Sequence, residues 1–330
     1  MSWNNYCAAA LAGVALLPQP APTEGLRLSY PLACKNGVTC VVQNYVDADP
    51  GHAAKDYRCG SETYHGHNGV DIRLADKAEQ LRGISVLASA PGVVARLRDG
   101  AADISIRAPG APSVAGTECG NGVIIAHEGG WETQYCHMAK GSLVVRVGDR
   151  VERGARLGQV GLSGMTEFPH LHLTVRHNDK VVDPFGPKLA PGTCSPIAGN
   201  DLWDDPARKA LKYRSGEVLN SGFSDTVVTM ERVEDGRIDP PSLKSIFIVG
   251  YVRAIHLRAG DQLVLTLIGP SGKVETSRTM DPLDRDEAQM LTYVGMRRPV
   301  QGWAPGLYRG FYQVLRKGQE VTVSTFITKL

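Results

Sequence analysis

The stretch GNGVIIAHEGGWETQYCHM at residues 120–138 decides the fold, because it holds two β-rich runs joined by a tight turn. Gly129 and Gly130 fall between the runs, where a hairpin needs residues that tolerate positive φ. Side chains alternate faces along a strand, so Tyr135 and His137 are expected on one face, with a packing role for Tyr135. The pattern predicts an antiparallel β-hairpin.

The flanking sequence continues in strands and turns. GISVLASAPGVVARLRDG at 83–100 has two β-rich runs around Pro91-Gly92, and SLVVRVGDRVERGARLGQVGLSG at 142–164 has glycines at tight corners between short strands. Such a sequence favours a compact, bent antiparallel β-sheet over βαβ units. We therefore predict an all-β domain over residues 64–195.

Histidines gather in two short segments of this domain. In HLH at 170–172, alternation places His170 and His172 on one side of a strand, opposite the apolar residues between and after them. In HNGVD at 67–71, His67 and Asp71 would share a face, and Gly69 between them leaves space for a metal. A zinc hydrolase needs three protein ligands, an open fourth position and groups that move protons. The histidine and aspartate set supplies these residue types.

With YCH at 135–137 between them, these motifs resemble the lysostaphin/LytM-type zinc endopeptidases of bacterial cell walls. That family has HxGxD, then YxHL, then HxH, in this order. The resemblance covers about residues 64–185. Met138 replaces the usual Leu, and residues 165–168 fill a variable loop.

The resemblance implies a compact half-barrel β-domain of the duplicated hybrid motif type, with one Zn²⁺ held by His67, Asp71 and His172. It also implies that His137 and His170 act as the catalytic proton-transfer or oxyanion groups, and the division of labour between them stays open. Unperturbed imidazoles titrate near neutrality, which suits such roles.

The function expected from the resemblance is hydrolysis of peptide bonds in wall cross-links or stem peptides, with peptidoglycan as the partner. A non-catalytic wall-binding or amidase-activating protein, or a secreted zinc protease of other substrates, stays open. The net charge of +2 gives no reason to expect nucleic acid. No apolar run reaches about 18 residues, so we expect no transmembrane segment. The oligomeric state stays open.

Residues 1–27 are predicted to be a leader. CAAALAGVALL at 7–17 has the length of a signal-peptide apolar region and precedes a proline-rich stretch. MSWNNY at 1–6 lacks Lys and Arg, so a buried terminal helix or a misassigned start is the alternative. The prediction is export to the periplasm or beyond the cell.

Cysteine usage supports export, because six cysteines follow Cys7 and an even number in an exported domain favours disulfides. Six cysteines allow 15 pairings. Cys119 and Cys136 flank the hairpin and Cys34–Cys40 closes a short loop, which leaves Cys59–Cys194. Residues 28–63 are expected to be a disulfide-bound loop region packed on the peptidase domain.

The rest of the chain is predicted as a linker at 196–215, with a helix at 204–213, and a small Ig-like β-sandwich at 216–330. Four β-rich runs with Gly, Pro and Asp turns support the sandwich. Wall binding, cleft covering and a folding role are all open for it. A chain ending near Asn200 is expected to retain the whole catalytic machinery.

Overall fold

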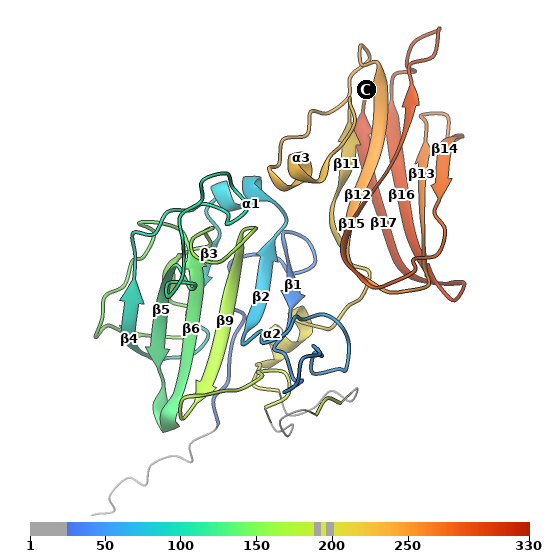
Figure 1. Cartoon of the computed structure of the whole chain (residues 1–330). Helices are drawn as coiled ribbons and strands as arrows, with labels where there is room; N and C mark the ends of the chain where they lie inside the picture. Colours follow the sequence, from blue (N-terminus) through green and yellow to red (C-terminus); the bar gives the residue numbers. More distant parts are fainter. Residues whose placement is uncertain (1–24, 188–192, 196–200) are drawn as a thin grey trace, which may run out of the picture.

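The computed structural model describes residues 25–187, 193–195 and 201–330, and the leader predicted at 1–27 lies almost wholly outside them. Two β-rich bodies lie side by side, joined by the segment around helix α2 (Figure 1). Both bodies consist of antiparallel sheets, which confirms the predicted all-β class. No helix among the described residues is long and apolar enough to cross a membrane.

The first body contains one large antiparallel sheet in the order β1-β2-β9-β6-β5-β4-β7, with β10 added to β9. The predicted hairpin forms its centre. Its strands are β1 (Cys40–Asn44), β2 (Val70–Leu74), β4 (Gly92–Arg98), β5 (Asn121–Ala126), β6 (Trp131–Met138), β7 (Arg150–Val151), β9 (His170–His177) and β10 (Lys180–Val181). The pair β3 (Ser85–Leu87) and β8 (Arg156–Gln159) forms a separate ribbon, and helix α1 (Lys77–Leu81) follows β2.

The core of this body lies on one face of the large sheet. Leu171, Leu173 and Val175 of β9 are at most 1% exposed, as the alternation of that strand predicted. Each such side chain contributes roughly 1.5–3 kcal/mol by burial. The opposite face of β9 is thereby left for His170 and His172.

The interpretation of residues 28–63 as loop is wrong for Cys40–Asn44, which form edge strand β1 on β2. Alternation is hard to read in CVVQN because Val41 and Val42 are both buried, one on each side. The three predicted disulfides are confirmed: Cys34–Cys40, Cys59–Cys194 and Cys119–Cys136. They tie this segment and the hairpin to the body.

The second body is a two-sheet sandwich, with a three-stranded sheet β11-β12-β15 and a four-stranded sheet β14-β13-β16-β17 (Figure 1). Val252, Leu265 and Tyr312 are fully buried between the sheets. The elements are α2 (Asp205–Ala210), β11 (Val218–Ser224), α3 (Met230–Glu234), β12 (Phe247–Leu257), β13 (Asp261–Ile268), β14 (Val274–Thr279), β15 (Glu287–Arg297), β16 (Leu307–Arg316) and β17 (Gln319–Lys329).

The two bodies contact each other through buried polar groups. Arg73 of β2 and Arg253 of β12 are at most 1% exposed, and both guanidinium groups bind the Glu234 carboxylate of α3. A second contact joins the Arg258 guanidinium to Glu62, with 3.0 Å between Nη2 and Oε1. Arg73, Arg253 and Glu62 are buried at the interface, so the second body is packed on strand β2, which carries Asp71.

Candidate metal centre

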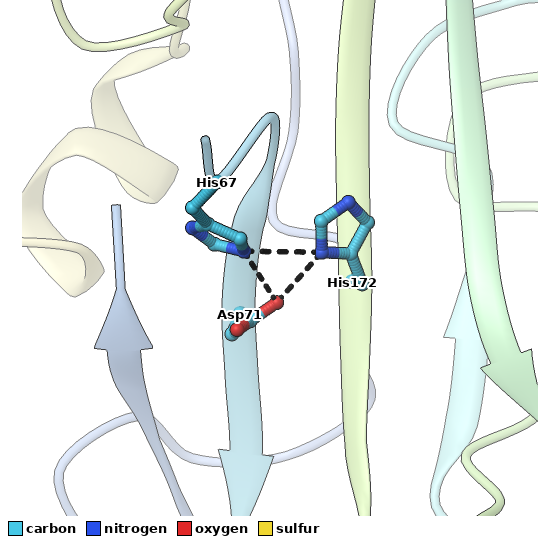
Figure 2. Close-up of side chains that lie close together, drawn as sticks. All are labelled: His67, Asp71 and His172. Carbon is cyan, nitrogen blue, oxygen red and sulfur yellow. Dashed lines mark hydrogen bonds and ion pairs between the residues drawn. The ribbon is translucent and has the colours of Figure 1, made fainter. Parts of the chain in front are cut away.

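Strands β2 and β9 bring the candidate ligands together, because Asp71 and His172 are direct partners in their antiparallel register. His67 lies in the turn before β2. The distances are 2.8 Å from Asp71 Oδ1 to His172 Nδ1, 3.1 Å from Asp71 Oδ1 to His67 Nε2, and 3.2 Å between the two nitrogens (Figure 2). Ligand atoms around a tetrahedral Zn²⁺ with bonds of 2.0–2.1 Å lie about 3.3 Å apart, so the triangle has a suitable size.

Gly69 makes room within the cluster. A Cβ atom at this position would lie 2.5 Å from His172 Nε2 and 2.6 Å from His172 Cε1. The space expected beside Gly69 is thus filled by the imidazole ring of His172.

Outer hydrogen bonds fix which atom of each ligand faces the centre. His67 Nδ1 donates to the Tyr45 carbonyl at 2.6 Å, and Asn44 Nδ2 donates to Asp71 Oδ2 at 2.9 Å. His172 Nε2 lies 3.1 Å from the Asn68 side-chain oxygen, which can only accept a hydrogen bond. In these tautomers, His67 Nε2 and His172 Nδ1 present lone pairs.

Two nitrogen lone pairs and a carboxylate oxygen therefore converge on one point. Such a set repels itself unless a cation or a shared proton lies between the atoms, and it is a donor set that zinc prefers. The residues present fit a metal ion. The two outer partners Asn44 and Tyr45 were missed from the sequence because strand β1 itself was missed.

His137 reaches the same cleft through a β-bulge. Its φ of 62° lies in the left-handed region, and the β5–β6 register changes between Asn121 and Val123. The predicted shared face of Tyr135 and His137 is wrong, because the extra residue reverses the alternation. Tyr135 is fully buried in the core, where it accepts a hydrogen bond from Ser89 N at 2.8 Å, as its packing role requires.

His137 and His170 face each other, with ring centroids 4.6 Å apart. His137 Nδ1 donates to the Ser163 carbonyl at 2.8 Å, and His170 Nδ1 donates to the Phe168 carbonyl at 3.0 Å. His170 Nε2 lies 3.4 Å from Asp71 Oδ1. All five side chains singled out in the sequence thus converge on one centre.

Burial and neighbouring charges set the protonation of the cluster. Burial, reinforced by the charges of His170 and His172, holds the pKa of His137 well below its ordinary value. The pKa of His137 thus lies below that of the unperturbed imidazole, and His137 is a neutral imidazole at pH 7. Burial would raise the pKa of Asp71, but His170 and His67 outweigh it and hold that pKa well below its usual range. Asp71 is ionised, the form that binds a metal.

The centre opens into a cleft of about 390 Å³. Tyr64 and Met165 lie along it beside the histidines, and Thr174 and Arg176 extend it along β9. His65, two residues before His67, is exposed and faces His52 outside the cluster.

Comparison with known proteins defines the class of this domain. Residues 65–184 match the model of peptidase family M23, so this part of the chain is an M23 peptidase domain. An uncharacterized metalloprotease of Haemophilus influenzae is 31% identical over 129 residues, which are 39% of this chain and 22% of that protein. The family and this relative support peptidase chemistry.

Two further proteins are similar. The peptidoglycan DD-endopeptidase ShyA of Vibrio cholerae is 42% identical over 53 residues, 16% of this chain and 12% of that protein. The catalytic domain of lysostaphin from Staphylococcus simulans has 22% identity and a TM-score of 0.27, covering 43% of this chain and 85% of that one. The chain matches less than a quarter of the length of its curated relatives.

Proposed function

We propose that this protein is an exported zinc-dependent endopeptidase that hydrolyses peptide bonds of bacterial wall peptidoglycan. The observation that carries the proposal is the convergence of two imidazole lone pairs and one carboxylate beside two further histidines in an M23 domain. The name of the ShyA relative supports peptidoglycan as the substrate class.

His67 Nε2, Asp71 Oδ1 and His172 Nδ1 would hold the metal. A bound Zn²⁺ supplies Lewis acidity, which makes water a stronger acid and a peptide carbonyl a better electrophile. His137, neutral and hydrogen-bonded through Nδ1, keeps its Nε2 lone pair to accept a proton. His170 has its Nδ1 proton held by Phe168, so its Nε2 is the atom available to exchange a proton with the substrate.

The proposed export has independent support in the three disulfides of the described residues. Disulfides persist in oxidising compartments and are rare in the cytosol. Peptidoglycan is also found in the envelope, where such a chain would meet it.

The test is digestion of purified cross-linked muropeptides by the full chain, with the new termini identified by mass spectrometry. We expect cleavage that stops with a chelator and returns with added Zn²⁺, and about one equivalent of zinc per chain. Asp71→Ala is the negative control, because it removes the central ligand oxygen. Cleavage that is undiminished in chelator and in Asp71→Ala would refute the proposal.

A further inference from the structure

The cleft is lined by a positively charged side chain, Arg176, that the proposed metal chemistry does not use. Arg176 lies on β9, four residues after His172, and both line the cleft with Thr174 between them. Residues at even spacing on a strand share a face, so the three side chains form a row that leads away from the metal ligands. Figure 1 shows β9 running through the middle of the sheet, which gives this row a rigid base.

The Arg176 guanidinium is held by a neutral group. Its Nη1 donates to Gln134 Oε1 at 2.7 Å. Glu132 is its register partner on β6, but the Glu132 carboxylate lies 3.7 Å from Arg96 Nη2 instead. In the part of the chain that the structure describes, Arg176 forms no ion pair, so its charge is left for something that enters the cleft.

We propose that Arg176 is a subsite for a carboxylate group of the substrate peptide. The proposal rests on the proposed endopeptidase function and specifies its substrate as an acid-bearing peptide. Arginine presents a planar fork of donors that matches a carboxylate, and Gln134 fixes one arm of that fork. A lysine or glutamine would not offer the same paired donors.

The position of Arg176 also sets where the acid must lie. Four residues along an antiparallel strand span about 13 Å, and an extended peptide advances about 3.3–3.6 Å per residue. The acid is therefore separated by about two to four residues from the bond that is cut. Glu118 also lines the cleft, but it is exposed to water, so its repulsion of the acid is weakened.

The test compares two soluble peptides from the wall that differ only in carrying a carboxylate or a carboxamide at one residue in this range. For the wild-type chain we expect kcat/KM to be about 10–100-fold higher for the acid, the range for a hydrogen bond to a charged group. Arg176→Gln should lose this preference, mainly through KM, while its zinc content stays unchanged. Arg176→Lys should retain part of the preference.

Lys180→Gln is the matched control, because it removes one positive charge from an exposed position on the neighbouring strand β10. It should keep the full preference for the acid. Equal cleavage of acid and amide by the zinc-loaded wild type would overturn the subsite and leave the peptidase function intact. If the zinc-loaded chain cleaves neither of the two peptides and no whole muropeptide, the proposed endopeptidase function itself is refuted. If Arg176→Gln does not fold, the wild-type comparison alone decides.

Discussion

The backbone of His137 is held in an uncommon conformation, and that conformation turns its side chain toward the proposed metal ligands. A non-glycine residue with positive φ costs of order 1–3 kcal/mol and persists where the surroundings enforce it. Here the His137 N–H donates to the Cys119 carbonyl at 2.8 Å, and its carbonyl accepts from Gly161 N at 2.9 Å. The strained residue is thus fixed on both sides.

This geometry separates the roles of two neighbouring side chains. Asp71→Ala should lose zinc and activity together, because Asp71 Oδ1 lies within 3.1 Å of both ligand nitrogens. His137→Ala should retain most of the zinc and lose about 10²–10⁴-fold in kcat, the usual contribution of a proton-transfer group. Metal analysis beside steady-state kinetics checks both. Loss of zinc in His137→Ala would mean that this histidine belongs to the ligand set.

Asn44 offers a test of the outer hydrogen bonds. Its Nδ2 donates to Asp71 Oδ2 at 2.9 Å and thereby orients the carboxylate. Asn44→Ala should weaken zinc affinity about 10–100-fold, as loss of such partners usually does. Competition with a chromogenic chelator measures the change. Unaltered affinity would show that the sheet alone holds Asp71 in place.

Asp183 links stability to pH. Burial raises its pKa to about 7, and its Oδ2 is buried with no hydrogen-bond partner among the described residues. The Asp183 carboxyl group therefore binds its proton more tightly in the folded chain than in the unfolded chain, where the pKa of an Asp is about 3.9. The stability from this group is complete below about pH 4 and is lost as pH rises through about 7.

Asp183→Asn should remove the loss of stability that accompanies a rise in pH through about 7. The thermal midpoint of the variant should fall less between pH 5 and pH 8 than that of the wild type, in metal-loaded samples. Parallel curves for the two chains would contradict the raised pKa.

At the scale of elements, the sequence predicted those strands whose alternation is regular. The 120–138 hairpin and β9 have an apolar face and a polar face, so period two identifies them. Strand β14, VETSRT, is mostly exposed and has no such contrast, while Gly222 and polar residues interrupt β11. Both lie outside the four predicted runs for that reason, and so does β15, in which Thr292 alone is buried.

The candidate site was predictable for a related reason, and only in part. Metal-ligand residue types at short spacing are visible in one sequence, and the resemblance to the LytM-type endopeptidases implied that His67, Asp71 and His172 are the ligands. The hydrogen bonds that hold them come from distant segments, such as Asn44 for Asp71 and the Tyr45 carbonyl for His67. The bulge at His137 depends on pairing between strands, which no local pattern records.

The hairpin disulfide should matter for turnover as well as stability. Cys119 supplies the carbonyl that holds His137 N, and Cys136 precedes His137. A Cys119→Ser, Cys136→Ser double variant should lose kcat while it still binds zinc. The equivalent Cys34, Cys40 variant is the control: it removes a disulfide with a sequence separation of 6, against 17 for the hairpin disulfide, and we expect only a decrease in stability. Equal kinetics in the two variants would contradict this role.

At the scale of the whole molecule, the second body is packed on the strand that carries Asp71. Arg73 follows Asp71 by two residues and its guanidinium lies 3.9 Å from the ring centroid of Phe168, whose carbonyl holds His170. Nη2 of the same guanidinium lies 2.8 Å from Glu234 Oε2 of the second body. We therefore expect a chain ending near Asn200 to be destabilised, although every candidate site residue lies before that point.

Glu234→Ala should lower the free energy of unfolding by about 3–5 kcal/mol, because it leaves two buried arginines without their carboxylate. Glu231→Ala is a matched control on the same helix, since the Glu231 side chain is 83% exposed. Its effect should stay within about 0.5 kcal/mol. Urea unfolding at fixed zinc concentration measures both. Similar values for the two variants would show that the buried contact contributes little.

The shared carboxylate of Glu234 also limits how the M23 domain of this chain can be recombined with other domains. Lytic enzymes are often treated as modular proteins, in which a catalytic domain can be joined to different targeting domains. A chimaera that joins the first body to an unrelated domain would contain buried Arg73 without the carboxylate of Glu234. Its lower stability would reduce the yield of folded protein, whatever the new domain binds. The two bodies should therefore be kept together when this chain is recombined with other domains.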